Sequence, residues 1–284
     1  MILRYYVDYD TNIKAYLEKL KLPKTLQSDL GKNTGSLLVN NQIVHNYYQL
    51  KKGDLLEIII PSTENKKVKP IKEPFDIIYE DSYLLIINKR ADLATLPTNE
   101  HYNCSLANHI MAYYKEKGIA STIHFVNRLD APTTGLLIVA KNSYLKYLMT
   151  KTAITKKYLL MVEKIVISDK GTIETGIKRV DDNIILRQTC DDGPRAKTTY
   201  EILKRFDNKT LIEATLHTGK THQIRVHFQS IGYPLIGDIL YGNGKKGERL
   251  LLHSYFISFF HPITKKEMRF VNCPDWLLPH YLPS

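Results

Sequence analysis

The stretch from His124 to Lys141 (HFVNRLDAPTTGLLIVAK) constrains the fold more than any other part of the chain. A polar loop that contains Pro132 leads through Gly135 into the uninterrupted apolar run 136–140. An apolar run of this length after a glycine predicts a buried strand. The loop therefore holds Asp130 shortly before a rigid element, which is where catalytic side chains tend to be held. The alternative for a single aspartate is a turn residue that caps backbone amides.

The surroundings of Asp130 favour the catalytic interpretation. The stretch resembles the catalytic motif of the RluA-type pseudouridine synthases, His-Arg-Leu-Asp-x-x-Thr-Ser-Gly followed by an apolar strand and Ala-Lys. Asn127 stands in place of the usual His and Thr134 in place of the usual Ser, and both keep hydrogen-bonding groups. The matching residues are Arg128, Leu129, Asp130, Thr133, Gly135, Ala140 and Lys141.

Two later stretches extend the resemblance. Tyr158 follows two lysines at the start of a predicted strand, as in the second motif of the family. Residues 216–242 (LHTGKTHQIRVHFQSIGYPLIGDILYG) are similar to the third motif, with Lys220 in place of the usual Arg. The resemblance is strong from residue 76 to residue 270. It implies that Arg225 pairs with Asp130 and that Tyr158 lies against the substrate base.

The third motif also predicts a helix. Thr221 can cap it, and Gly232 is the expected end. Arg225 lies off the apolar face, near the helix start, and is expected to face a cleft. The predicted buried stripe, spaced at i, i+3, i+4 and i+7, consists of Ile224, His227, Phe228 and Ile231.

Residues 1–60 are predicted to form a small separate module. Thr11 or Asn12 can cap a helix, and the pair Asn40-Asn41 suits a hairpin turn because Asn tolerates positive φ. The end of the module is similar to an S4-like RNA-binding domain, and its helical half matches that pattern poorly. Lys14 on the helix and Lys24 in the following loop would contact RNA phosphates. The alternative is a solvated charged helix face.

Charge and composition indicate the class of binding partner and the division of the chain into domains. A formal net charge of +11 over 284 residues favours a polyanion such as nucleic acid, and the alternative is a merely basic soluble protein. Residues 61–74, rich in proline and lysine, are expected to be a linker, with the catalytic domain in residues 75–284.

Other function classes are disfavoured by what the sequence contains. Three cysteines without a Cys-x-x-Cys motif indicate reduced thiols and a cytoplasmic protein, with no signal peptide and no membrane-spanning run. No glycine-rich phosphate motif is present, and His217, His222 and His227 are spaced unsuitably for a metal site. We therefore expect neither a metal nor any other cofactor. We also expect the protein to be a monomer.

Together these observations predict an α+β protein with the pseudouridine synthase fold, a mixed and largely antiparallel central sheet, and a small N-terminal S4-like domain. The resemblance implies an enzyme that isomerises uridines in RNA to pseudouridine, with Asp130, Tyr158 and Arg225 as catalytic residues. Ribosomal RNA is the favoured substrate and transfer RNA the alternative. A non-catalytic RNA-binding or ribosome-assembly factor with the same fold is the rival function. The residues expected to bind RNA are Arg128, Lys220, His222, Lys14 and Lys24.

Overall fold

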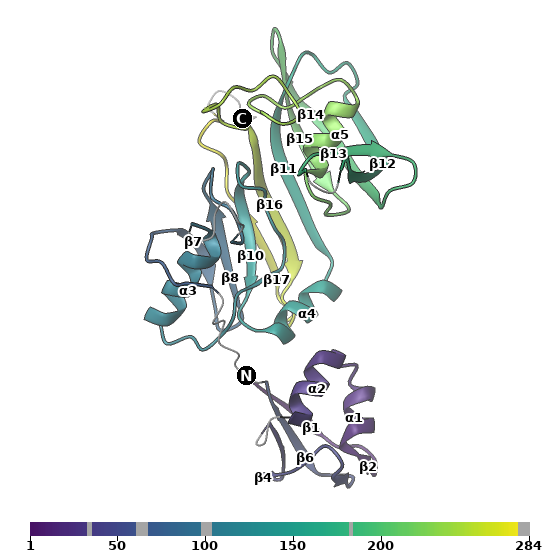
Figure 1. Cartoon of the computed structure of the whole chain (residues 1–284). Coiled ribbons are helices and arrows are strands. Elements are labelled where there is room, and N and C mark those ends of the chain that lie inside the picture. The colour runs from purple at the N-terminus through teal and green to yellow at the C-terminus, as the bar shows by residue number, and fades with distance from the viewer. Residues whose placement is uncertain (33–35, 61–67, 98–103, 182–183, 278–284) are drawn as a thin grey trace.

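The computed structural model describes residues 1–32, 36–60, 68–97, 104–181 and 184–277. Residues 1–60 contain a small four-stranded sheet, and the strands from residue 76 onward build a large sheet (Figure 1). In the described ranges, no helix is long and apolar enough to cross a membrane.

The elements of the N-terminal module are β1 (Ile2–Tyr6), β2 (Thr11–Asn12), α1 (Ile13–Lys19), α2 (Lys24–Lys32), β3 (Leu37–Val39), β4 (Gln42–Ile43), β5 (Gln49–Leu50) and β6 (Leu55–Ile59). Those of the larger module are β7 (Asp76–Glu80), β8 (Leu84–Lys89), α3 (Leu106–Glu116), β9 (His124–Phe125), β10 (Thr134–Ala140), α4 (Ser143–Lys151), β11 (Ile154–Glu163), β12 (Lys170–Arg179), β13 (Arg187–Cys190), β14 (Arg195–Arg205), β15 (Lys209–Leu216), α5 (Gln223–Ser230), β16 (Leu252–Phe260) and β17 (Glu267–Val271).

The N-terminal module confirms two sequence predictions. The side chain of Asn12 accepts a hydrogen bond from the backbone N–H of Ala15 and caps α1. Asn40 and Asn41 have φ of 50° and 68°, so they form the predicted tight turn between β3 and β4.

A second helix in this module was not predicted. Lys24, expected in a loop, is the first residue of α2. Pro23 precedes it, and its fixed φ suits a helix start. Leu26 and Leu30, four residues apart, bury one face of α2 in the core of the module. The residues between these two leucines are polar, so the short apolar face was not recognised from the sequence.

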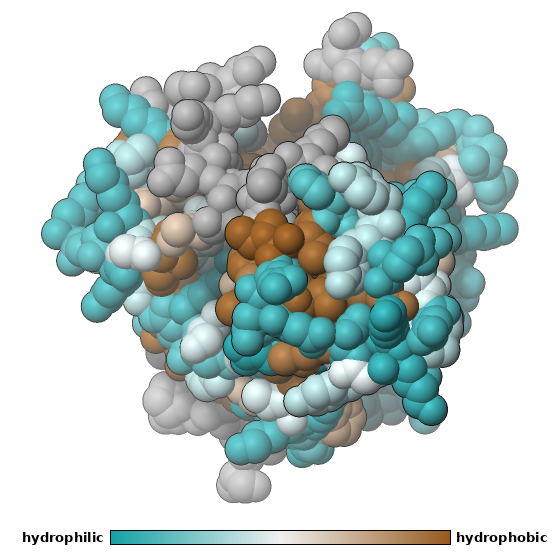
Figure 2. All heavy atoms as spheres, turned by 90° about the horizontal axis from the view of Figure 1, so that it is seen from below, coloured by the Kyte–Doolittle hydropathy of each residue, from teal (hydrophilic) through white to brown (hydrophobic). Residues whose placement is uncertain are grey.

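The N-terminal module contacts helix α4 of the larger module. The Tyr147 hydroxyl donates to the carbonyl oxygen of Lys21 at 2.9 Å, and Tyr144 packs into the apolar core of the N-terminal module. Viewed from the end where this module lies, the molecule shows a hydrophobic patch ringed by hydrophilic residues (Figure 2). The two modules therefore meet through side chains as well as through the connecting chain.

The large sheet has 11 strands within the described residues. Its main order is β13-β12-β14-β15-β11-β16-β10-β8-β7, with β17 paired to β16 and β9 paired to β10. Strands β10 and β16 run parallel, and the other strand pairs that the structure describes in this sheet are antiparallel. The predicted mixed, largely antiparallel sheet is confirmed.

Alternate residues along the strands enter different cores. On β8, Leu85 belongs to the core that also contains residues of α3 and α5, whereas Leu84 belongs to the core that contains residues of α4. On β11, Tyr158 lies in the first of these cores and Leu159 in another, as the period of two predicts. Tyr158 therefore lies on the face of the sheet that α5 covers.

The predicted buried strand after the polar loop is β10, and its start makes a close backbone contact. Gly135 lies opposite Ser254 of β16 and has φ of +109°, a conformation that side chains other than glycine rarely adopt. A Cβ at this position would overlap the backbone of Ser254. Glycine is therefore required where the loop enters the sheet.

Helix α5 differs from its prediction at its start and in its buried stripe. Thr221 is not the N-cap; His222 occupies that position with φ of 58° and makes no side-chain cap. Ile231 lies past the last helical residue and is 38% exposed, so it does not extend the buried stripe. Arg225, expected to face a cleft, is buried. Gly232 follows the C-cap with φ of 83°, as predicted for the helix end.

The contact at Gly135 predicts a large effect of one methyl group. We expect Gly135→Ala to lower the free energy of unfolding by about 3 kcal/mol or more, because it adds overlap with Ser254 to an unfavourable φ. Urea denaturation followed by circular dichroism measures this. Gly219→Ala is the matched control, because a Cβ there meets no atom within 4 Å. Equal stability of the two variants would contradict the role assigned to Gly135.

A second prediction concerns His227 on α5, which is 0% exposed. Burial lowers the pKa of His227 from 6.5 to about 4. Between these pH values the unfolded chain binds a proton that the folded chain does not, so stability falls as pH is lowered through this window. His253 and His124, whose pKa values burial also lowers to about 4, act in the same direction.

The measurement is the free energy of unfolding at pH 7.5 and at pH 5.0. We expect His227→Gln to reduce the loss between these conditions by about 2 kcal/mol relative to the unmodified chain. His217→Gln, at an exposed histidine directly after β15, serves as the control and should leave the loss unchanged. If both variants show the full loss, His227 is not a source of the pH dependence.

Candidate active site

Asp130 lies on a loop whose backbone is fixed on both sides of it. The carbonyl oxygen of Leu129 accepts a hydrogen bond from the Thr95 hydroxyl at 2.7 Å, and that of Ala131 accepts one from the Lys89 ammonium at 2.8 Å. The Asp130 side chain itself is 25% exposed. The loop thus presents a carboxylate to the outside from a constrained backbone.

Lys89 is the residue that ties this loop to the end of β8. Its side chain is 1% exposed, and its ammonium also donates to the carbonyl oxygens of Arg90 and Leu93 at 2.9 and 2.8 Å. Burial lowers the pKa of Lys89 to about 7, and the negative charge of Asp130 acts in the opposite direction. Three carbonyl acceptors and a nearby carboxylate compensate for placing this amine in the interior.

The two residues that replace family motif residues also hold the loop. Asn127 accepts a hydrogen bond from the backbone N–H of Ile138 at 2.8 Å through its side-chain oxygen. The Thr134 hydroxyl lies 2.6 Å from Nδ1 of His253 on β16. Both departures from the family pattern therefore keep a hydrogen bond to a strand.

Arg225 lies between two carboxylates. Its Nε and Nη2 donate to the two oxygens of Asp238, each at 2.7 Å, and both side chains are buried. Its Nη1 lies 3.6 Å from Oδ2 of Asp130. The pairing of Arg225 with Asp130 that the family resemblance implied is present as the longer contact, and Asp238 is the residue that fixes the guanidinium in place.

His222 and Tyr241 complete the surroundings of Asp130. Nε2 of His222 lies 3.9 Å from Asp130 Oδ2, and Nδ1 lies 2.7 Å from the Tyr241 hydroxyl. That hydroxyl accepts a hydrogen bond from the Arg187 backbone N–H at 2.9 Å, which leaves its own proton for Nδ1 of His222. Burial lowers the pKa of His222, against the opposing effect of Asp130. A neutral His222 then directs its Nε2 proton toward Asp130.

Tyr158 reaches the same region from β11. It lies opposite Ser254 of β16, and Ser254 in turn lies opposite Gly135 at the exit of the Asp130 loop. Burial raises the pKa of Tyr158 to about 12, and the charge of Asp130 adds to this effect. The phenol therefore stays protonated at neutral pH and can act as a proton donor.

The residues predicted to bind RNA fall into two groups. Arg128 is exposed beside Asp130, Lys220 is exposed on the loop before α5, and His222 lies at the site as described. Lys14 and Lys24 are exposed on α1 and α2 of the N-terminal module. The first group lies on the Asp130 loop and on the segment that leads into α5, and the second lies on the other module.

Sequence reasoning had assigned no role to several residues that build the site. Gln223 accepts hydrogen bonds from the Lys220 N–H and the Thr218 hydroxyl, and so closes the loop before α5. Asp238 and Tyr241 lie within the third motif, and Lys89 ends β8. A single carboxylate in the otherwise apolar segment 234–240 was the available signal for Asp238.

Comparison with known proteins agrees with this geometry. The model of the RNA pseudouridylate synthase family matches residues 83–230. The chain belongs to this family. The synthase is 37% identical over 267 residues to the uncharacterized RNA pseudouridine synthase YjbO of Bacillus subtilis, a match covering 91% of this chain and 93% of that protein.

Other relatives carry more specific names. Ribosomal large subunit pseudouridine synthase D of Zymomonas mobilis is 30% identical over 274 residues, covering 89% of this chain and 85% of that protein. The solved structure of human RNA pseudouridylate synthase domain containing 1 has a TM-score of 0.59 at 22% identity, covering 77% of this chain and 89% of that chain. This likeness shows that the synthase has the pseudouridine synthase fold.

The contact between Arg225 and Asp238 generates a prediction. In Asp238→Asn, one carboxylate oxygen becomes an NH₂ group that cannot accept from the guanidinium, so Arg225 loses its fixed position beside Asp130. We expect kcat for tritium release from RNA containing 5-tritiated uridine to fall about 100-fold, with KM changed little.

The control applies the same substitution to a surface ion pair. Asp275 pairs with Arg249 at 2.7 Å and its side chain is 74% exposed, so Asp275→Asn should leave kcat unchanged. Thermal unfolding of both variants separates a lost position of Arg225 from a loss of folded protein. A variant Asp238→Asn with normal kcat would show that Asp130 does not depend on this ion pair.

Proposed function

We propose that the synthase isomerises particular uridines in RNA to pseudouridine with Asp130 as the catalytic carboxylate. The observation that carries this proposal is the position of Asp130, on a constrained loop, partly exposed and 3.6 Å from a buried guanidinium. Arg225 attracts and orients the carboxylate, and Tyr158 offers a protonated phenol nearby. A turn aspartate that only caps backbone amides would not need a buried cation beside its side chain.

The reaction breaks the bond between N1 of uracil and C1′ of ribose, turns the base, and joins C5 to the same C1′. The proton that C5 loses balances the one that N1 gains, so no oxidant, reductant or group donor is consumed. The Asp130 carboxylate either attacks C1′, as in retaining glycosidases, or helps to remove a ribose proton so that a glycal forms. Tyr158 would stack against the base and relay a proton.

Access to a uridine within folded RNA requires that the base leave its stack. Arg128, exposed on the same loop as Asp130, would fill the vacated position, and Lys220 and His222, on the segment that leads into α5, would contact the RNA. The formal net charge of +11 favours binding of the negatively charged RNA backbone. We also propose residues 1–60 as an S4-like module that contacts phosphates through Lys14 and Lys24, with a linker over 61–74 and the catalytic domain over 75–284.

Ribosomal RNA is the substrate that we favour, and a relative named ribosomal large subunit pseudouridine synthase D supports this choice. The three free thiols of the chain are consistent with a reducing compartment, and we place the synthase in the cytoplasm as a monomer. Transfer RNA is the alternative substrate, and a non-catalytic RNA-binding factor is the alternative function.

The proposal predicts that Asp130→Asn abolishes catalysis without weakening RNA binding. Because the amide is neither a nucleophile nor a base, we expect tritium release to fall at least about 1,000-fold, with RNA affinity near that of the unmodified chain. Asp191→Asn, at an exposed aspartate, is the control and should react normally. Retained turnover by Asp130→Asn would rule out Asp130 as the catalytic carboxylate.

The RNA class is decided by pseudouridine mapping in cells that lack the synthase. We expect one or a few ribosomal RNA positions to lose the modification, and only the unmodified chain, not Asp130→Asn, to restore it. Loss of the modification at transfer RNA positions instead would identify transfer RNA as the substrate. Equal rescue by both forms would favour the non-catalytic factor.

A further inference from the structure

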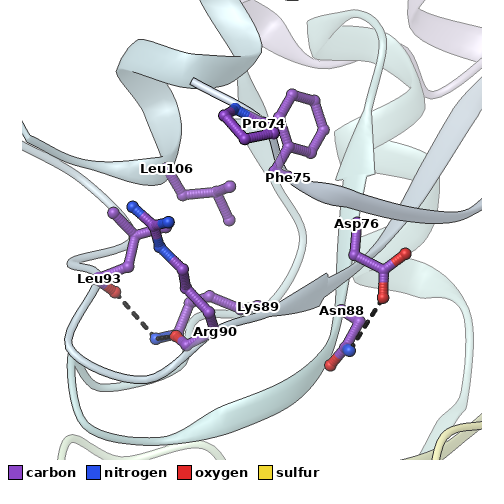
Figure 3. A pocket seen from close by; sticks show the side chains of 8 residues that line it. All are labelled: Pro74, Phe75, Asp76, Asn88, Lys89, Arg90, Leu93 and Leu106. Atoms are coloured by element: carbon purple, nitrogen blue, oxygen red, sulfur yellow. Dashed lines mark hydrogen bonds between the residues drawn. The ribbon is translucent and has the colours of Figure 1, made fainter. Parts of the chain in front are cut away.

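A pocket lies on the larger module next to the end of β8, apart from the carboxylate of Asp130. It encloses about 380 Å³, within the range of small-ligand sites (Figure 3). Of the residues described above, Lys89 and its carbonyl partners Arg90 and Leu93 line it. It is lined by Pro74, Phe75, Asp76, Asn88, Lys89, Arg90, Leu93 and Leu106.

One part of the pocket is apolar. Leu93 and Leu106 are buried, and Phe75 is half-buried with its ring edge-on to Tyr113, at a centroid distance of 5.6 Å. Figure 3 shows Phe75 close to Leu106 on one side of the hollow. The accessible ring of Phe75, backed by the two leucines, provides a contact suited to the flat face of an aromatic heterocycle.

A second part of the pocket is polar and rich in hydrogen-bond acceptors. Asp76 and Asn88 lie opposite each other on β7 and β8, and Asn88 Nδ2 donates to Asp76 Oδ2 at 3.0 Å (Figure 3). This bond leaves Oδ1 of Asp76 and the side-chain oxygen of Asn88 as acceptors. Among the RNA bases, guanine has two neighbouring donors, N1–H and the N2 amino group, on its Watson–Crick edge, so it matches this pair best.

The third part is a positive charge. Arg90 is exposed, and within the described ranges its guanidinium forms no hydrogen bond or ion pair. An exposed guanidinium beside a base-sized pocket suits the phosphate of the same nucleotide. Apolar surface, paired acceptors and a cation together match the base and the phosphate of one nucleotide.

We propose that this pocket binds an unpaired guanine nucleotide of the substrate RNA, separate from the uridine that reacts. The proposal rests on the proposed function only in taking RNA as the source of the nucleotide. Lys89 lines the pocket and also donates to the carbonyl oxygen of Ala131, next to Asp130. A nucleotide held here contacts the residue that ties down the Asp130 loop, and so fixes the register of the RNA relative to the site.

The first test needs no catalytic activity. The full-length chain labelled with ¹⁵N is titrated with GMP, AMP, CMP and UMP, and backbone amide shifts are followed by NMR. We expect GMP to bind most tightly and to shift the amides of Asp76, Asn88, Arg90 and Leu93. Equal affinity for the four nucleotides, or shifts elsewhere only, would overturn the proposal.

Two substitutions at exposed positions assign the contacts. Asp76→Asn should weaken GMP binding about tenfold and abolish the preference over AMP, because a carboxylate acceptor is lost. Asp207→Asn, at an exposed aspartate in the turn before β15, is the matched control and should bind GMP normally. Arg90→Gln should bind GMP no more tightly than guanosine. An unchanged GMP preference in Asp76→Asn would remove the basis of the base assignment.

The source of the nucleotide is distinguished with short RNAs. The pentamer UUGUU should bind more tightly than GMP and more tightly than UUAUU, and this preference should disappear in Asp76→Asn. If UUGUU binds no better than GMP, the ligand is a free nucleotide and the RNA assignment fails. Tritium release by the same preparations is measured separately, so loss of the guanine preference is told apart from loss of the isomerase activity.

Discussion

The site depends on one row of backbone contacts across the centre of the large sheet. Ser254 of β16 lies opposite Gly135 on one side and Tyr158 on the other. The parallel pairing at Gly135 determines where the Asp130 loop enters the sheet. A register shift between Lys157 and Tyr158 sets the position of the tyrosine. Residues far apart in the sequence reach one place because β16 is inserted between β10 and β11.

Ion pairs in the interior refine this arrangement. Burying Arg225 and Asp238 costs several kcal/mol per ion, which a two-bond pairing offsets only when the remaining groups are satisfied. Asp238 Oδ1 also accepts from the backbone N–H groups of Leu240 and Tyr241, at 3.0 and 3.1 Å. The consequence is a guanidinium that cannot turn away from Asp130. The Lys89 ammonium constrains the Asp130 loop by donating to the carbonyl oxygen of Ala131 as well as to those of Arg90 and Leu93.

Local pattern was enough to predict much of the fold. The strand at β10, the face of Tyr158 and the turn at Asn40-Asn41 follow from periodicity and residue chemistry over a few positions. The burial of Arg225 was not predictable in this way, because its partner Asp238 lies 13 residues away in a segment that contains no helix or strand. The start of α5 was missed for a similar reason, since the loop before it is closed by the side chain of Gln223 rather than by a capping residue.

The interior of the site and the exposed loops around it differ in charge, and this separates two tasks. Arg225 and the Lys89 ammonium offset the two carboxylates, Asp130 and Asp238. His222 and Tyr158, with pKa values shifted below and above the neutral range, add no charge at neutral pH. The interior therefore offers no excess positive charge to a phosphate and accepts an uncharged base. Exposed Arg128 and Lys220 lie on the loop that carries Asp130 and on the loop before α5, where they would attract phosphate. The base can then enter while its backbone stays outside, which is the arrangement that flipping a single nucleotide requires.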